Sequence, residues 1–363
     1  MPELQGMGHD QAAAELRGGL SMPGLPVAIA WLALLFVASL AGTVAARRYA
    51  IRRDLLDHPG ERRSHVVATP RGGGIGIVVA MLGALGLLAW WNPAQALPMA
   101  LAATGLLLVS GIGWIDDHRP LTPWSRLAVH AVASVLLAAV AYGAGGQWVC
   151  VLLAFALCMV LVNIWNFMDG IDGIAALQAL VVAAAIALLA NDAAARWIAL
   201  ALAAACFGFL PLNLPRARIF LGDVGSGALG YLLALAMVLV ATGGGQATSP
   251  AAWVLLLLPP SAFFLDASLT LLVRMLRGER WWTPHVGHLY QRAAREVGRH
   301  WPVTLAYAAW AMVAGGLAFA IRDRPETFIM CSGIAWYLGG GILWLGSGAH
   351  RGLDSGLPGK QSG

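Results

Sequence analysis

Aspartate, asparagine and glycine residues gather in three short clusters of an otherwise apolar chain. The richest is residues 163–173, which hold two carboxylates, two amides and two glycines. The other two are the adjacent pair Asp116 and Asp117, and residues 220–226 around Asp223. Each cluster stands at the end of an apolar segment, where ionisable groups are costly to bury and so indicate function.

These side chains suit a hard cation and a phosphate. Carboxylate and amide oxygens are ligands that Mg²⁺ prefers, particularly where substrate phosphates complete its shell. Asp223 lies in a Gly-Asp-x-Gly-Ser turn before an apolar segment, so the helix that begins there would offer N–H groups and a positive dipole end to an anion. Two adjacent aspartates alone could equally be a solvated helix end. Three acidic turns on one face favour a site for a metal and a diphosphate.

Other polar residues leave two interpretations open. The three glycines after Arg71 are either a flexible loop or a phosphate contact through backbone N–H groups, with Arg71 as the cation. His285 and His288 are either interfacial residues or hydrogen-bond donors to a diphosphate, and such a pair alone does not support a zinc site. Asp266 lies inside an apolar segment and is either a site residue or a packed polar anchor.

The composition predicts the elements that must position these clusters. Hydrophobic residues make up 59% of the chain and charged residues 11%, against about 45–50% and about 25% in soluble domains. The chain is therefore expected to be an all-α, polytopic membrane protein. Its net charge of +5 is explained by the positive-inside rule rather than by nucleic-acid binding. The four cysteines lie in apolar segments without metal-ligand or disulfide spacing and indicate reduced packing residues.

About 10–11 transmembrane helices are expected, because a helix needs about 20 apolar residues to cross a bilayer. The candidate spans are 27–46, 75–91, 97–114, 126–142, 148–166, 173–190, 196–213, 225–241, 251–273, 302–320 and 327–347. We expect one transmembrane domain over residues 26–348. A weakly ordered segment over 1–25 would precede it, and a cytoplasmic tail over 349–363 would follow.

The distribution of basic residues predicts the orientation. Most of the 23 lysines and arginines fall in loops on one side of these spans, which places the N-terminus outside and the C-terminus in the cytoplasm. In this topology all three acidic clusters face the cytoplasm, although nothing in the assignment required it. A single miscounted span would have moved the later clusters to the opposite face.

The motifs, in this order, resemble one family. Asp116-Asp117, the Asn-x-x-Asn-x-x-Asp-Gly-x-Asp-Gly run at 163–173, Asn213 with Phe-x-Gly-Asp-x-Gly-Ser at 220–226, and the histidine loop are similar to those of the polyprenyl-phosphate N-acetylhexosamine-1-phosphate transferase superfamily, glycosyltransferase family 4. The similarity spans roughly residues 55–300. The first loop, residues 58–74, resembles the branch that initiates O-antigen synthesis on N-acetylfucosamine- or N-acetylquinovosamine-type sugars.

The sequence departs from the family pattern at two places. Many relatives have a lysine in the first loop, where this chain offers Arg71. The muramoyl-pentapeptide enzymes have consecutive histidines, whereas here His285 and His288 are separated. The second departure argues against a muramoyl-pentapeptide substrate.

The resemblance implies a reaction in which a UDP-N-acetylhexosamine and undecaprenyl phosphate give an undecaprenyl-diphospho-sugar and UMP. It implies Mg²⁺ as cofactor, with Mn²⁺ as an alternative ion, held by Asp223 and Asn166. Asp116 and Asp117 would orient or deprotonate the lipid phosphate, or assist the metal. Direct attack by the lipid phosphate and a covalent aspartate intermediate both remain open.

The remaining roles also follow from the resemblance. Asp169 and Asp172 would hold the nucleoside, Phe220 would pack on the uracil and Asn213 would support the site. His285, His288 and Arg71 would contact diphosphate or sugar. The implied catalytic set is Asp116, Asp117, Asp223, His285 and His288. The implied substrate-binding set is Arg71, Gly72, Gly73, Asn163, Asp169, Asp172, Asn213 and Phe220.

The expected protein is thus a multi-pass enzyme of the bacterial inner membrane with a cytoplasmic active site, starting a lipid-linked glycan such as O-antigen. Its partners would be the UDP-sugar, undecaprenyl phosphate and the bilayer, without nucleic acid, and the resemblance allows a homodimer. The alternative is a transporter or flippase of lipid-linked sugars. Transporters hold such carboxylates near mid-bilayer, often with inverted repeats, and no repeat is visible here.

Overall fold

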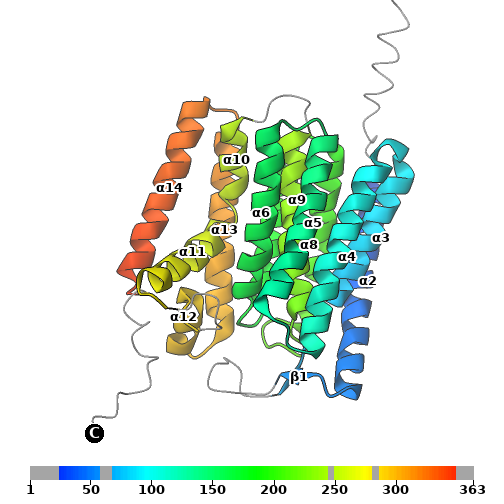
Figure 1. Cartoon of the computed structure of the whole chain (residues 1–363), viewed down its shortest axis with the longest axis vertical. Helices are drawn as coiled ribbons and strands as arrows, with labels where there is room; N and C mark the ends of the chain where they lie inside the picture. Colours follow the sequence, from blue (N-terminus) through cyan, green and yellow to red (C-terminus); the bar gives the residue numbers. More distant parts are fainter. Residues whose placement is uncertain (1–23, 58–67, 244–248, 280–285, 349–363) are drawn as a thin grey trace, which may run out of the picture.

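The computed structural model describes residues 24–57, 68–243, 249–279 and 286–348, and these residues are almost entirely helical (Figure 1). The helices are α2 (Leu25–Arg52), α3 (Ile75–Trp91), α4 (Ala96–His118), α5 (Pro123–Gly143), α6 (Trp148–Phe167), α7 (Ile174–Leu189), α8 (Ala193–Phe209), α9 (Asp223–Thr242), α10 (Pro250–Leu257), α11 (Ser261–Leu276), α12 (Leu289–Val297), α13 (His300–Ile321) and α14 (Glu326–Gly346). Short 3₁₀ turns cover Pro93–Gln95 and Leu210–Leu212, and two strands cover Leu56–Asp57 (β1) and Thr69–Pro70 (β2).

The helix lengths confirm an all-α, multi-pass membrane protein. Within the described residues, eight helices are long and apolar enough to cross a membrane, or nine if a bent pair counts as one span. Two shorter apolar helices, α3 and α7, stand in the same bundle. Together they match the eleven predicted segments, and the chain runs up and down through them in sequence order (Figure 1).

One predicted span is broken. The segment expected to cross as a single helix over 251–273 forms α10 and α11, whose axes differ by 87°. The break falls at Pro259 and Pro260, between the end of α10 at Leu257 and the start of α11 at Ser261. Proline lacks the backbone N–H and its ring disfavours helical geometry in the residue before it, so two successive prolines end one helix and begin another.

Helix α9 occupies the centre of the bundle. In its apolar window 94% of the residues are buried, because α4, α6, α7 and α8 pack around it. Close packing depends on glycine at these contacts. A Cβ on Gly230 would meet the backbone of α6 at Leu161, and one on Gly113 of α4 would meet the backbone of α9 at Asp223. The end of α4 therefore lies against the start of α9.

The loops at one end of the bundle are tied to each other through backbone hydrogen bonds. β1 and β2 pair antiparallel, with Leu56 opposite Pro70. The amide of Phe220 donates to the Pro70 carbonyl at 2.7 Å, and the Gly73 amide donates to the Phe220 carbonyl at 2.9 Å. This interlock sets the loop before α9 beside the loop before α3.

Asp266 on α11 is a packed polar anchor. Its side chain is buried, and its carboxylate accepts hydrogen bonds from the backbone N–H groups of Leu289 and Tyr290 at 2.8 and 3.1 Å. Tyr307 of α13 donates to it at 2.7 Å and Trp344 of α14 at 3.4 Å. The carboxylate thus satisfies orphan N–H groups at the start of α12 and joins this short helix to α11, α13 and α14.

Candidate active site

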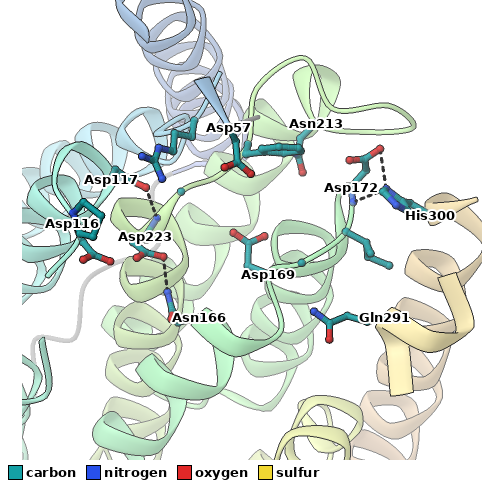
Figure 2. A pocket seen from close by; sticks show the side chains of 16 residues that line it. Asp57, Asp116, Asp117, Asn166, Asp169, Asp172, Asn213, Asp223, Gln291 and His300 are labelled. Carbon is teal, nitrogen blue, oxygen red and sulfur yellow. Dashed lines mark hydrogen bonds and ion pairs between the residues drawn. The ribbon is translucent and has the colours of Figure 1, made fainter. Parts of the chain in front are cut away.

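A cavity of about 510 Å³ opens at the end of the bundle where α4 and α6 end and α9 and α13 begin (Figure 2). Its wall is formed mainly by polar side chains from these elements and from the loops beside them. The lining residues are Asp57, Arg71, Asp116, Asp117, Pro120, Asn166, Asp169, Gly170, Ile171, Asp172, Asn213, Phe220, Gly222, Asp223, Gln291 and His300. The three acidic clusters, far apart in sequence, therefore share one cavity.

Arg126, in the first turn of α5, neutralises one end of this cavity. Its Nη1 lies 2.9 Å from Asp116 Oδ2 and 3.2 Å from Asp223 Oδ2, while Nη2 donates to Asn166 Oδ1 at 2.7 Å. The Asn166 amide in turn donates to Asp223 Oδ1 at 2.8 Å and to Ser226 Oγ at 3.1 Å. Three oxygen-bearing side chains from α4, α6 and α9 thus converge on one guanidinium. Its several N–H donors lie in one plane and can bind more than one oxygen acceptor at once.

Asp117 caps helix α9. Its Oδ1 accepts from the Asp223 amide and its Oδ2 from the Val224 amide, both at 3.1 Å. The carboxylate therefore satisfies two of the N–H groups that a helix start leaves unpaired and sits at the positive end of the helix dipole. The sequence led us to expect these N–H groups to be offered to a ligand anion. The protein instead supplies that anion itself, from α4.

The opposite end of the cavity is formed by the turn between α6 and α7, around residues 169–173. Asn213 fixes this turn, because its Oδ1 accepts from the Gly173 amide at 2.9 Å while its Nδ2 donates to the Ile219 carbonyl at 2.9 Å. Gly173 has φ of 76°, a left-handed conformation that favours glycine. The first turn of α13 contacts the same turn through His300 and Asp172.

Asp169 lies between the two ends (Figure 2). Desolvation inside the cavity is the main cause that raises the pKa of its carboxyl to about 8, and the neighbouring carboxylates of Asp223, Asp117 and Asp172 raise it further. At neutral pH without a bound cation, this carboxyl is therefore mostly protonated. It can then donate a hydrogen bond, which an ionised carboxylate cannot do.

Most predicted site residues in the described part line the cavity. They are Arg71, Asp116, Asp117, Asn166, Asp169, Asp172, Asn213, Phe220 and Asp223. Asn163 does not line it: one turn earlier on α6, its amide donates to the Met159 carbonyl at 2.7 Å. Gly72 and Gly73 do not line the cavity either, and the Gly73 N–H that we expected to face a phosphate donates to the Phe220 carbonyl.

The two histidines of the predicted loop also differ from expectation. His288 is 2% exposed, is the N-cap residue of α12 and lies with its Nδ1 3.9 Å from Asp266 Oδ1, outside the cavity wall. Its burial lowers its pKa. His285 falls outside the described residues, as do residues 58–67 of the first loop. In place of His288, Gln291 in the first turn of α12 lines the cavity.

Four functional candidates were missed by sequence reasoning: Arg126, Asp57, Gln291 and His300. Arg126 and His300 each lie in the first turn of an apolar helix that begins on the face that carries the acidic clusters. Their sequence signal is thus the topology itself, since a charged or titratable residue in the first turn of such a helix must face the same side. Asp57 and Gln291 carry no comparable signal in their spacing.

The residues at the Arg126 end fit a divalent cation. Within the described residues no group of three or more His, Cys, Asp or Glu side chains is arranged to hold a metal ion. Mg²⁺ is often held by one or two carboxylates together with substrate phosphates, and Asp223, Asp116 and Asn166 already direct oxygen atoms at one positive group. Asn166 Oδ1 is bonded to Arg126 here, so coordination by this oxygen requires the guanidinium to move.

The sequence matches known proteins over this region and beyond. Residues 99–241, which contain all three acidic clusters, match the model of glycosyl transferase family 4. The decaprenyl-phosphate N-acetylglucosaminephosphotransferase of Mycobacterium tuberculosis is 31% identical over 350 residues, covering 85% of this chain and 86% of the relative. The Mycobacterium leprae protein of the same name is 32% identical over 349 residues, covering 85% of each chain.

The chain belongs to glycosyl transferase family 4. This confirms the superfamily that the motifs indicated, and it makes the protein a membrane-bound enzyme of the phosphotransferase class. A more distant member, the undecaprenyl-phosphate alpha-N-acetylglucosaminyl 1-phosphate transferase of Escherichia coli K12, is 26% identical over 273 residues, covering 68% of this chain and 72% of the relative. The O-antigen branch within the family stays a prediction.

Proposed function

We propose that this protein transfers a sugar 1-phosphate from a UDP-N-acetylhexosamine to undecaprenyl phosphate at the cytoplasmic face of the membrane. The products are UMP and an undecaprenyl-diphospho-sugar, which starts a lipid-linked glycan of the O-antigen type. The observation that carries this proposal is the convergence of three acidic turns on one cavity at one end of the helix bundle, with Arg126 paired to Asp116 and Asp223. The reactions in the names of its relatives are of this kind.

In the proposed reaction, an oxygen of the lipid phosphate attacks the phosphorus that carries the sugar. The new P–O bond forms as the bond between the two donor phosphates breaks, and UMP leaves with the electron pair. A lipid phosphate has its second pKa near 6, so at neutral pH it is largely dianionic and needs little deprotonation. The barrier is mainly the approach of an anion to a negatively charged diphosphate.

The residues of the chain would lower that barrier electrostatically. Asp223 and Asn166 would hold Mg²⁺ or Mn²⁺, which neutralises and positions phosphate oxygens when bound. Arg126, paired to Asp116 and Asp223, and Arg71, which lines the cavity, would supply fixed positive charge to the phosphates. Asp116 binds Arg126 and orients it. Asp117 fixes the start of α9 and so the position of Asp223.

The nucleoside would lie at the Asp172 end, with Phe220 against the uracil. Direct attack by the lipid phosphate is the simpler path, because the attacking group is already an anion. A covalent intermediate would allow labelled UMP to exchange into the UDP-sugar without any acceptor. Direct attack predicts that this exchange requires undecaprenyl phosphate.

UMP release by purified protein tests the proposal. The assay contains undecaprenyl phosphate, Mg²⁺ and a panel of UDP-N-acetylhexosamines that includes N-acetylglucosamine and its 6-deoxy relatives. We expect release with one donor, lost with chelator and in Asp223→Ala. Asp323→Asn is the matched control, since this exposed carboxylate follows α13 at the far end of the bundle and should leave release unchanged. If well-folded protein releases no UMP with any donor, the proposal is contradicted and the transporter alternative is favoured instead.

A further inference from the structure

His300 and Asp172 form a pair at the end of the cavity away from Arg126. The imidazole Nδ1 lies 3.1 Å from Asp172 Oδ2 and 3.3 Å from the Asp172 backbone nitrogen. Without a proton, Nδ1 accepts a hydrogen bond from this amide; with a proton, it donates one to Oδ2, and this second state is the one that holds the carboxylate. Both side chains line the cavity, and both are largely buried, with 16% of the His300 side chain and 14% of the Asp172 side chain exposed. Figure 2 shows the pair across the cavity from Asp116 and Asn166, with Asp169 between them.

The two residues come from elements that are distant in sequence. Asp172 lies in the turn before α7, while His300 is the first residue of α13. Thr304, one turn further along α13, donates to the Asp172 carbonyl at 2.7 Å. The start of α13 therefore holds Asp172 through both its side chain and its backbone, and its positive dipole end favours the carboxylate there.

Such an arrangement fixes a hydrogen-bond acceptor in a defined direction. An ionised carboxylate accepts several hydrogen bonds and donates none. With Oδ2 held by the imidazole, Asp172 keeps acceptor capacity for a group bound in the cavity that it lines. The phosphates of a nucleotide sugar belong at the Arg126 end, where the guanidinium lies. The Asp172 end is then left for a part of the substrate that donates a hydrogen bond without carrying charge.

We propose that His300 is a positioning residue that aligns the Asp172 carboxylate with the imide N–H of uracil and so selects a uridine nucleotide. This inference rests on the proposed function. Uracil presents an N–H at the ring position where cytosine presents an acceptor nitrogen. A carboxylate held in place therefore accepts a hydrogen bond from uracil. Opposite cytosine, the carboxylate and the ring nitrogen are both acceptors, and no proton lies between them. Sites built around a hydrogen bond reject analogues that lack the partner group strongly.

Nδ1 is the ring nitrogen that faces Asp172, and two amide substitutions can distinguish its contribution from that of Nε2. The side-chain amide nitrogen of asparagine lies close to the position of Nδ1, whereas that of glutamine lies close to the position of Nε2. His300→Asn should keep the support of Asp172. His300→Gln and His300→Ala should lose it. Arg299→Ala is the control, because Arg299 is an exposed neighbour whose removal changes the local charge without touching Asp172.

The experiment is steady-state UMP release with UDP-sugar and with the matching CDP-sugar. For His300→Ala and His300→Gln we expect the KM for the UDP-sugar to rise about tenfold. We expect kcat and the KM for undecaprenyl phosphate to stay within about twofold, and the preference for UDP-sugar over CDP-sugar to fall by about the same factor of ten. His300→Asn and Arg299→Ala should resemble the wild type.

Several results would overturn the inference. They are an unchanged donor KM in His300→Gln, an equal loss in His300→Asn and His300→Gln, or an unchanged base preference in both. A change in sugar preference instead of base preference would assign this end of the cavity to the sugar. If the alanine variant does not fold, the two amide variants still decide the question. The proposed function fails separately, through a wild-type protein that releases no UMP.

Discussion

At the level of single residues, Arg126 is the cation that balances the carboxylates at one end of the cavity. Its guanidinium joins Asp116, Asp223 and Asn166, and two carboxylates this close to each other would repel without it. The same three side chains are the ones that could coordinate a divalent cation. Arg126 therefore holds these three side chains together.

Replacing Arg126 by alanine should make the stability of the protein depend more on a divalent cation. We expect Arg126→Ala to unfold at a lower temperature than the wild type in chelator, because Asp116 and Asp223 lose their counterion. Added Mg²⁺ should raise its melting temperature by at least about 2 °C more than it raises that of the wild type. Thermal unfolding in detergent, with and without Mg²⁺, measures this difference.

Arg126→Lys serves as the comparison, since lysine keeps the charge but cannot make the same set of contacts from one planar group. UMP release should fall about 100-fold or more in Arg126→Ala, as removal of a group that stabilises developing charge does elsewhere. An equal response of variant and wild type to Mg²⁺ would show that the cation binds elsewhere.

Asp169 should impose a pH dependence on stability. Its pKa is about 8 in the folded protein and about 3.9 in an unfolded chain. Between these values the folded state binds more protons than the unfolded state, so the contribution of Asp169 to stability falls as pH rises from about 4 to about 8. Asp169→Asn, which stays neutral, should lack this contribution.

Melting temperatures of wild type and Asp169→Asn, measured in chelator at pH 6, 7, 8 and 9, test this expectation. The wild type should lose more stability than the variant between pH 6 and pH 8, by at most about 1.4 kcal/mol per pH unit. Above pH 9 the two curves should run parallel. Curves that are parallel from pH 6 onwards would mean that Asp169 is already ionised.

The sequence identified the acidic residues of the cavity because carboxylates between apolar segments stand out. It could not identify how they pair. Asp116 and Asp117 are adjacent and look equivalent, yet one binds Arg126 and the other caps α9. His288 looked like a ligand-binding group and is instead buried beside Asp266. These assignments depend on side-chain direction at helix ends, which hydrophobic patterns do not specify.

At the level of elements, the start of α9 is held by a residue of another helix. Asp117 of α4 accepts from the first two amides of α9, so its loss should affect folding as well as activity. We expect Asp117→Ala to lower stability by about 1–2 kcal/mol, as loss of a helix cap does. Asp223→Ala should abolish UMP release with a much smaller change in stability.

The comparison requires thermal unfolding and UMP release for both variants under the same conditions. Asp117→Asn keeps one acceptor oxygen and should fall between wild type and Asp117→Ala in melting temperature. Equal stability of Asp117→Ala and wild type would mean that the cap is not used in solution. Asp117 would then have to be regarded as a residue of the chemistry alone.

The lengths of the apolar segments predicted ten of the eleven spans as single helices and missed the break between α10 and α11. The two prolines were visible in the sequence, but a proline pair in an apolar segment allows either a kink or a full turn of the chain. The two helices meet at 87°, and α11 also makes tertiary contacts that the sequence does not show. Among these, Asp266 binds the amides at the start of α12.

For the whole molecule, the topology predicts which end of the bundle faces the cytoplasm. Gln147 precedes α6 at the end of the bundle away from the cavity. Arg218 lies in the loop before α9, at the cavity end. In cells expressing Gln147→Cys in a Cys331→Ser background, an impermeant maleimide added outside should label the protein. Arg218→Cys in the same background should be labelled only after the membrane is opened.

The Cys331→Ser background removes the one cysteine that is exposed, since Cys150, Cys158 and Cys206 are buried. It also gives the unlabelled control. For a protein of the inner membrane of a bacterium with two membranes, the outer membrane must be made permeable to the reagent first. Labelling of Arg218→Cys in intact cells would reverse the orientation and place the cavity outside.

The burial of α9 has a consequence for how the protein is made. In its final place this helix has almost no lipid-facing surface. It packs against α4, α6, α7 and α8, all of which leave the ribosome before it. Asp223 is therefore the last of the three acidic clusters to arrive. During synthesis the cavity stays without this carboxylate until the surrounding helices have already been inserted.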